Sequence, residues 1–454
     1  SIMLLCTLFF LYCRHATLSK YPDKGTLSAL DNFMVLCTDP SYAGTSQFAS
    51  AVRTLGLYLM TFLYPHPLSC DYSYSSLIPV GFSDPGFIFS FLILAGLLGY
   101  AIFLFIPRKN SLVNKPALSF SLLWFFIAMS ITSNVFFLIG TSFGERLLFV
   151  PSVGLTMALV LLMARFLQKK SPEEQPLIPS LKASPVFTLL LFGITLLYSI
   201  KTWSRNADWK SDFSLFSKDV ESYPNSTHLL FYMANHLSGS DFKDNLALDI
   251  EENHLNIDLK DSVLKANYRC IQLFNKALSI YPALPSDGYN QLGKAYFNTG
   301  RLDSAEKYYQ KALDEDSTNP IYTNNLGTVY YNSSIPLTQK GADFQKAGQL
   351  DSAQYYSVVG TNRLLEALPY FLKAHKGDST ETDFINNIGC IYGATQRSDS
   401  AIYWFRKAYE LDRYDEVSIQ FLEITYRAIG KTSDADFFKA RLAEARAHKN
   451  EQLR

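Results

Sequence analysis

The stretch YNQLGKAYFNTGRLDSAEKYYQKAL, from Tyr289 to Leu313, has a near copy in INNIGCIYGATQRSDSAIYWFRKAY, from Ile385 to Tyr409. Both stretches place an aromatic residue three positions after a glycine, then an alanine, a second aromatic residue and a second alanine at matching intervals. Small residues let two helices approach closely and aromatic residues fill the gaps, so this pattern predicts pairs of antiparallel helices. The shared positions are Gly293, Tyr296, Ala305, Tyr309 and Ala312 in the first copy and Gly389, Tyr392, Ala401, Phe405 and Ala408 in the second.

The spacing of these copies predicts a stacked array. Gly327 follows Gly293 by 34 residues, and Glu423 follows Gly389 by 34 residues, which is the period of the tetratricopeptide repeat. Gly389 follows Gly327 by 62 residues, so we expect 28 inserted residues, 333–360, inside the third unit. The second helix of that unit is expected to resume with Ala367, Phe371 and Ala374.

The array is expected to hold about five units. A less regular first unit pairs HLLFYMANHL (228–237) with CIQLFNKALSIYP (270–282), with a second insertion between them near residues 239–262. The last unit is expected to act as a polar cap, because the end of a solenoid faces water. We therefore predict an α-solenoid over residues 225–447, followed by a polar tail over residues 448–454.

The part of the chain before residue 204 has a different character. The whole chain is 48% hydrophobic, and the long apolar runs all lie in this part. Four of them approach the roughly 20 residues that a helix needs to span a bilayer, and they cover residues 87–106, 117–139, 147–167 and 184–203. We predict an all-α fold in which a polytopic membrane domain, residues 1–203, is joined to the repeats by residues 204–224.

Basic residues set the direction of the predicted spans. Arg108 and Lys109 lie between the first two runs, and Lys169 and Lys170 lie between the last two. Because cytoplasmic loops are enriched in Lys and Arg, we expect both connections to be cytoplasmic. The loop over residues 14–86, the turn before the third run and the repeats then lie on the non-cytoplasmic side.

Two segments of the first half do not match a full span. The apolar run AVRTLGLYLMTFLY, residues 51–64, carries Arg53 and is followed by prolines, so it fits an interfacial or re-entrant helix, although a short span remains an alternative. The run from Ile2 to Cys13 is also short, and it lacks the cleavage site of a signal peptide. We expect it to be the end of a membrane helix that begins before this segment.

Composition and motifs exclude several functional classes. The formal net charge is zero and no basic tract occurs, so no nucleic-acid partner is predicted. The cysteines and histidines show no zinc-binding spacing, so we expect no metal and no certain cofactor. Cys37 and Cys70 fall in the predicted external loop, where a disulfide or two packed thiols would both fit the sequence.

Three separated stretches carry a resemblance to a known family. SNVFFLIGTSFGERLLFVPSVGL, residues 133–155, precedes another apolar run and then SRNADWKSDFSLFSKDVESYPNSTHLLFYMA, residues 204–234. They resemble the membrane-to-repeat junction of the transmembrane and tetratricopeptide-repeat O-mannosyltransferases. DNFMV, which begins at Asp31, together with Arg53 and LSCDYSYSSLIP, residues 68–79, looks like the external segment that precedes this junction.

The resemblance implies a membrane glycosyltransferase. It would transfer a sugar, mannose, from a polyprenyl-phosphate donor to Ser or Thr of exported proteins, in contact with membrane lipids and with its repeats binding the acceptor or partner proteins. It also implies a catalytic acidic residue upstream of this segment. The style of the repeats suggests a bacterial inner membrane with the repeats in the periplasm. The alternative is a non-catalytic, membrane-anchored repeat scaffold in an envelope protein complex.

Charged residues near the predicted external face are the candidate site. Glu145 and Arg146 stand between two apolar runs, where a charge at mid-bilayer would be costly, so we place them at the membrane boundary. They either pin a turn or form a donor phosphate site in which Arg146 grips the phosphate and Glu145 orients Arg146. Arg53 either reaches a lipid headgroup or joins that phosphate site. Asp31 and Asp71 are acidic candidates of the external loop, with turn capping as the alternative.

Overall fold

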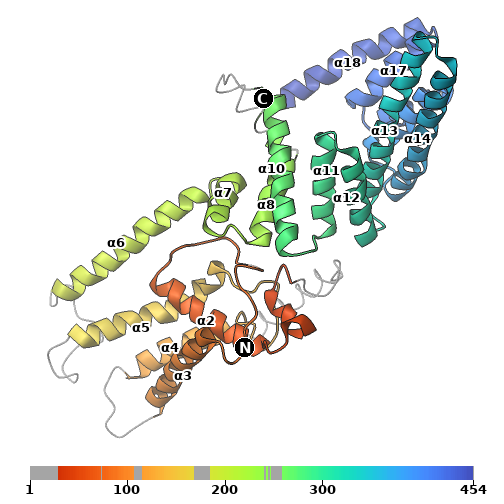
Figure 1. Ribbon diagram of the computed structural model, residues 1–454. Coiled ribbons are helices and arrows are strands. Elements are labelled where there is room, and N and C mark those ends of the chain that lie inside the picture. Colours follow the sequence, from red (N-terminus) through yellow and green to blue (C-terminus); the bar gives the residue numbers. More distant parts are fainter. Residues whose placement is uncertain are drawn as a thin grey trace, which may run out of the picture. The chain divides into compact units, whose positions relative to one another are not determined.

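The structure is a computed structural model that describes residues 29–72, 74–106, 115–167, 185–239, 242–243, 246 and 258–452. Over these residues the chain is helical and has no named β-strand, which confirms the predicted all-α class. It divides into two compact units, Ser1–Leu230 and Phe231–Arg454. The helices of the first unit are α2 (Gln47–Leu63), α3 (Pro85–Phe105), α4 (Lys115–Ser130), α5 (Phe149–Leu167), α6 (Pro185–Asp208), α7 (Asp212–Ser222) and the start of α8 (Thr227–Ser238) (Figure 1).

Within the part of the chain that the structure describes, three helical segments are long and apolar enough to cross a membrane. They are Pro85–Phe105 (α3), Glu145–Ala164, which joins the short 3₁₀-helix η3 (Glu145–Leu148) to α5, and Pro185–Asp208 (α6). They coincide with three of the four predicted spans. α2, which carries Arg53, is not one of them, so its assignment as an interfacial or re-entrant helix stays a prediction.

The second predicted span, residues 117–139, is shorter than expected, because α4 ends at Ser130. The residues that follow are irregular, and Asn134 among them has a positive φ of 56°. The Asn32 side chain donates hydrogen bonds to Asn134 Oδ1 (2.9 Å) and to the carbonyl oxygen of Ile139 (2.9 Å). Asn32, which is remote in sequence, therefore supplies hydrogen bonds that this irregular segment needs. The periodicity of apolar residues does not show where the helix ends.

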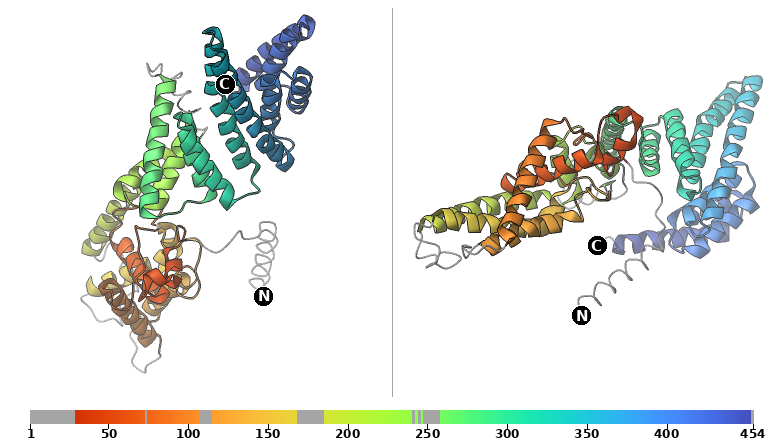
Figure 2. Two further views of the ribbon diagram at one scale, coloured as in Figure 1. Left: turned by 45° about the vertical axis from the view of Figure 1, so that its right-hand side comes forward. Right: turned by 90° about the horizontal axis from the view of Figure 1, so that it is seen from below.

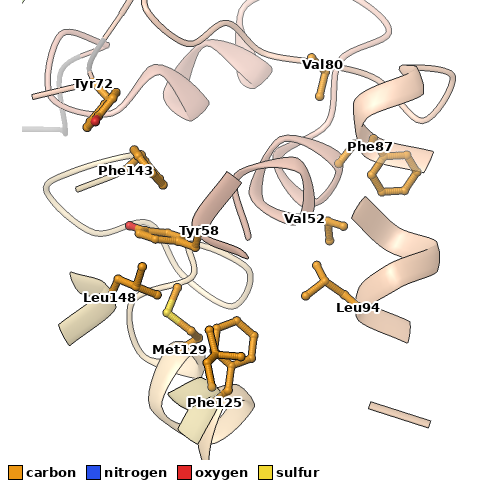
Figure 3. Close-up of a cluster of buried hydrophobic side chains, with 12 residues drawn as sticks. Val52, Tyr58, Tyr72, Val80, Phe87, Leu94, Phe125, Met129, Phe143 and Leu148 are labelled. Atoms are coloured by element: carbon orange, nitrogen blue, oxygen red, sulfur yellow. The ribbon is translucent and has the colours of Figure 1, made fainter. Parts of the chain in front are cut away.

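A core of buried aromatic and aliphatic side chains holds α2, α3, α4 and α5 together (Figure 3). The Tyr58 ring of α2 lies 4.3 Å from the Phe143 ring, and the Phe143 ring lies 4.7 Å from the Tyr72 ring, between ring centroids. Gly56 of α2 allows the closest approach to α3, because a Cβ atom there would lie 2.0 Å from Ser90 Oγ. The loop that contains Tyr72 is thus fixed to the membrane helices by packing.

The second unit is a succession of helix pairs, as Figures 1 and 2 show. After α8 come α10 (Leu259–Ile280), α11 (Ser286–Asn298), α12 (Leu302–Glu315), α13 (Pro320–Lys346), α14 (Leu350–Gly377), α15 (Thr382–Ala394), α16 (Ser398–Leu411), α17 (Glu416–Ala428) and α18 (Thr432–Gln452). Most of the predicted insertion 239–262 lies outside the described residues. In the first repeat, the helix expected to pair with HLLFYMANHL (228–237) is α10, which begins at Leu259.

The repeat positions pack as the sequence pattern predicts. A Cβ atom at Gly293 would lie 2.7 Å from the Tyr309 ring, and one at Gly389 would lie 2.6 Å from the Phe405 ring. Gly327 approaches Phe371 in the same way, at 2.8 Å. The six alanines of the pattern have no exposed surface: Ala305, Ala312, Ala367, Ala374, Ala401 and Ala408. Tyr296 is buried and Tyr392 packs at the edge of the last core cluster.

The residues of the predicted insertion 333–360 lie in the second part of α13, a short turn and the first part of α14, and they do not form a separate loop. α13 has 27 residues where α11 has 13, and α14 has 28 where α12 has 14, so each helix of the third pair is longer by 14 residues. At 3.6 residues per turn, 14 residues are close to four whole turns, so the lengthened helices keep the faces that contact each other. Gly341 and Gly360 pack against the opposite helix, and the tip turns at Gly348, with a φ of 74°.

Candidate functional site

A cavity of about 420 Å³ lies at the start of α5, and we call it the polar cavity because the charged side chains of Glu145 and Arg146 stand in its wall. Glu145 and Arg146 line it from η3, Ser69 and Cys70 line it from the loop after α2, and Trp209 lines it from the end of α6. The cavity therefore brings together three segments that are far apart in the sequence. The two charged residues picked out from the sequence lie in the same cavity.

Glu145 is held by the loop that precedes α3. Its Oε1 accepts hydrogen bonds from the hydroxyl of Tyr72 (2.5 Å) and from the backbone N–H of Ser69 (2.8 Å). Burial and the neighbouring carboxylate of Glu145 raise the pKa of Tyr72, so this hydroxyl stays protonated and remains a donor. The backbone N–H of Gly144 donates to the Tyr58 hydroxyl (3.0 Å), which fixes the residue before Glu145.

A buried ion pair fixes the other side of the cavity. Arg205 of α6 contacts both carboxylate oxygens of Asp219, at 2.7 and 3.0 Å, and Asp219 has no exposed surface. Asp219 Oδ2 also accepts a hydrogen bond from the backbone N–H of Cys70 (2.6 Å). Burial and this carboxylate raise the pKa of the Cys70 thiol, so Cys70 is a neutral wall residue.

Arg146 has no partner among the residues that the structure describes. Its side chain is exposed, and no ion pair or hydrogen bond of its guanidinium is found in this part of the chain. The orienting contact expected from Glu145 is not formed, because the Glu145 carboxylate is engaged by Tyr72 and Ser69. A free guanidinium in a cavity can bind two oxygens of a phosphate or carboxylate at once.

An apolar groove of about 900 Å³ adjoins the polar cavity, and Glu145, Leu148 and Ser152 line both. The groove follows α5 as far as Met163 and is closed on the other side by α6, from Leu191 to Asn206. The 16 residues from Leu191 to Asn206 extend over about 22 Å of helix, most of the thickness of a bilayer core. The arrangement offers a single ligand an end with the charged side chains of Glu145 and Arg146 and a long groove without a further charged side chain.

The remaining sequence candidates lie elsewhere. Arg53 lines a different apolar cavity, of about 530 Å³, between α2, α3 and α5, and its Nε lies 3.7 Å from Asp84 Oδ1. Asp71 Oδ1 lies 3.4 Å from His228 Nδ1. Asp31 is half-buried, next to the Asn32 side chain that caps the segment after α4. None of these three lines the cavity of Glu145 and Arg146.

The cysteines and possible metal ligands give a simple result. Cys37 and Cys70 are both free thiols, so of the two alternatives left open by the sequence the structure has two unpaired thiols and no disulfide between them. Among the described residues, no group of three or more His, Cys, Asp or Glu side chains could hold a metal ion.

Sequence reasoning missed Tyr72, Arg205, Trp209 and Asp219. Arg205 and Trp209 directly follow the last apolar run, where a cation and an aromatic residue are ordinary at a membrane boundary. Asp219 lies in a polar amphipathic helix and carries no local sign of burial. Arg205 and Asp219 are 14 residues apart and form a buried ion pair beside the cavity. No sequence pattern indicates that these two residues pair.

Comparisons with known proteins agree with the predicted resemblance. Models of the tetratricopeptide repeat match residues 286–319 and 382–415. The chain is 22% identical over 368 residues to Protein O-mannosyl-transferase TMTC3 of Homo sapiens, a match that covers 66% of this chain and 39% of that protein. It is 25% identical over 280 residues to Protein O-mannosyl-transferase Tmtc3 of Drosophila melanogaster, covering 55% of this chain and 29% of that protein.

A shorter match has higher identity. The chain is 32% identical over 124 residues to Protein O-mannosyl-transferase F38B6.6 of Caenorhabditis elegans, covering 27% of this chain and 15% of that protein. Among solved structures, MamA has a TM-score of 0.31 and 16% identity over 43% of this chain and 99% of that chain. The chain spans about a third of the length of the curated relatives it matches.

Proposed function

We propose that this protein is part of a membrane glycosyltransferase that transfers mannose from a polyprenyl-phosphate donor to Ser or Thr of exported proteins. The names of its relatives support sugar transfer to protein. The observation that carries the donor assignment is the polar cavity that opens onto an apolar groove, with the unpaired guanidinium of Arg146 in the polar part. A lipid-linked sugar phosphate likewise joins a charged phosphate to a long apolar chain.

Each part of the donor matches one part of the site. The polyprenyl chain would lie in the groove between α5 and α6, where its burial is favourable. The phosphate would lie at Arg146, which can hold two of its oxygens. During transfer, the acceptor hydroxyl oxygen bonds to C1 of the sugar. The bond from C1 to the phosphate oxygen breaks with its electron pair, and the hydroxyl proton passes to a general base. Arg146 would stabilise the negative charge that develops on the departing lipid phosphate.

The repeats supply the protein-binding part of this proposal. Stacked helix pairs form an extended surface that suits polypeptides, so the second unit would bind the acceptor or a partner protein. We place this unit on the non-cytoplasmic side of the membrane, which is the periplasm if the protein resides in a bacterial inner membrane. The distribution of Lys and Arg between the apolar runs supports this side.

The test is sugar transfer by the complete protein with the substitution Arg146→Lys. Lysine keeps the charge but loses the planar fork, so we expect transfer from polyprenyl-phosphate mannose to fall at least about tenfold while the amount of folded protein is unchanged. Arg53→Lys is the matched control, because Arg53 lines a different cavity and its loss should leave the donor phosphate unaffected. Normal transfer by the Arg146→Lys protein would contradict the phosphate role.

A further inference from the structure

Trp209 is a large aromatic side chain left in an exposed position. It follows the last residue of α6, 59% of its surface is exposed, and it lines the polar cavity together with Glu145 and Arg146. Its indole N–H donates no hydrogen bond to any residue that the structure describes. Burial of a tryptophan is strongly favourable, so a ring left open on a cavity is available to a ligand.

The position of this ring is supported from behind. The guanidinium carbon of Arg205 lies 5.9 Å from the centre of the Trp209 ring. Arg205 is itself fixed by two contacts with the buried carboxylate of Asp219. A cation at this distance attracts the ring, so the fixed guanidinium of Arg205 favours the position of Trp209 beside the cavity.

Glu145 offers a second contact in the same cavity. Its Oε1 accepts the two hydrogen bonds from Tyr72 and Ser69, whereas its Oε2 accepts none from the part of the chain that the structure describes. A carboxylate oxygen can accept hydrogen bonds only, and a sugar offers hydroxyl donors. The Tyr72 and Ser69 bonds fix the carboxylate, so its open oxygen has a defined place.

We propose that Trp209 and Glu145 bind the sugar of the lipid-linked donor, with the indole against the apolar face of the ring and Glu145 Oε2 accepting from its hydroxyls. This inference rests on the proposed function and adds a subsite to it. Arg146, Trp209 and Glu145 would then match the phosphate, the carbon face and the hydroxyls of a hexosyl phosphate in one cavity.

A membrane-boundary role is the competing explanation, and Trp203 provides the comparison. Trp203 is 82% exposed and lines the apolar groove, where an interfacial aromatic residue or a contact with the lipid chain is expected. Trp209 lines the polar cavity instead. Loss of Trp203 should therefore weaken the binding of polyprenyl phosphate with and without sugar equally. Loss of Trp209 should weaken only the binding of the lipid that carries the sugar.

The experiment measures the preference of the complete protein for polyprenyl-phosphate mannose over sugar-free polyprenyl phosphate. Both lipids displace a labelled polyprenyl-phosphate mannose from purified protein in detergent. We expect Trp209→Ala to reduce the preference about tenfold, Trp209→Phe to restore part of it, and Glu145→Gln to reduce it as well. Trp203→Ala should leave the preference at the wild-type value.

The outcomes separate this inference from the proposed function. If the wild-type protein prefers the mannose-bearing lipid and Trp209→Ala keeps that preference, the sugar subsite is wrong and the phosphate site at Arg146 stands. If the wild-type protein binds both lipids with equal affinity, the subsite is also wrong. If the wild-type protein binds neither lipid, the donor assignment fails and the subsite fails with it.

Discussion

Asp219 is the residue on which the geometry of the polar cavity depends. Its carboxylate has no exposed surface and binds Arg205 and the backbone N–H of Cys70, so it connects α6, α7 and the loop before α3. A buried pair of charges adds little net stability over an apolar pair, but removal of one partner leaves the other charge uncompensated. The effect of a substitution therefore depends on which partner remains.

We predict that Asp219→Ala destabilises the first unit by about 3 to 5 kcal/mol, because the nine-tenths buried Arg205 then lacks its counter-ion. The measurement is the thermal unfolding of the complete protein in detergent. The double variant Asp219→Ala, Arg205→Met should recover much of the loss, because no unpaired charge remains. An equal or larger loss in the double variant would show that the carboxylate acts mainly through the Cys70 N–H.

The sequence could predict which charges stand at the membrane boundary but not their partners. Glu145 and Arg146 are conspicuous because they interrupt apolar runs. The partners of Glu145, Tyr72 and Ser69, are more than 70 residues away and have no unusual local pattern. The direct contact in which Glu145 would orient Arg146 is not formed, because tertiary contacts occupy the Glu145 carboxylate.

At the scale of single elements, the third helix pair gives the best test of the repeat logic. Deletion of residues 333–360 joins Asn332 to Thr361 and restores a unit of 34 residues. The new junction would read Thr361-Asn362-Arg363-Leu364, which parallels the existing turn Thr299-Gly300-Arg301-Leu302. Gly300 has a φ of 75°, and asparagine tolerates this conformation better than other residues with side chains.

We therefore predict that deletion of residues 333–360 costs less stability than the single substitution Ala401→Phe. Ala401 has no exposed surface at the contact between α15 and α16, and overpacking of such a site costs about 1 to 3 kcal/mol. Denaturant unfolding followed by circular dichroism compares the two proteins, with Tyr403→Ala, an exposed position on the same helix, as the control. A deletion protein that unfolds before the Ala401→Phe protein would contradict the repeat register.

The length of this insertion could be predicted from the sequence, but its form could not. The distance from Gly327 to Gly389 gives the 28 extra residues, and Ala367 correctly marks the resumed second helix. Two lengthened helices and a looped insertion have the same residue count. The feature that distinguishes them is a second copy of the turn sequence G-x-L-D-S-A, which begins at Gly348 as it does at Gly300. This copy places a turn at the tip of a long helical hairpin.

For the whole molecule, the change in composition and the division into two compact units fall at different places in the chain. The apolar runs end at Trp203 and the structural division falls at Leu230. The intervening residues include α7, which carries Asp219 and belongs to the first unit because of the Arg205 pair. A change in hydropathy marks where the spans end, but it does not show that a polar helix beyond them packs back as part of the first unit.

The last prediction concerns this division. A fragment from Asn225 to Arg454 keeps all of α8, whose Phe231 packs against Gly288 and Phe274 within the repeat unit. Because each helix pair stacks mainly on its neighbours, the fragment should be soluble without detergent, helical by circular dichroism, and cooperative in thermal unfolding. A matched fragment that begins at Ser286 lacks α8 and α10 and exposes the apolar side of α11, so we expect it to aggregate or to unfold at a lower temperature. Equal behaviour of the two fragments would mean that α8 and α10 do not cap the array.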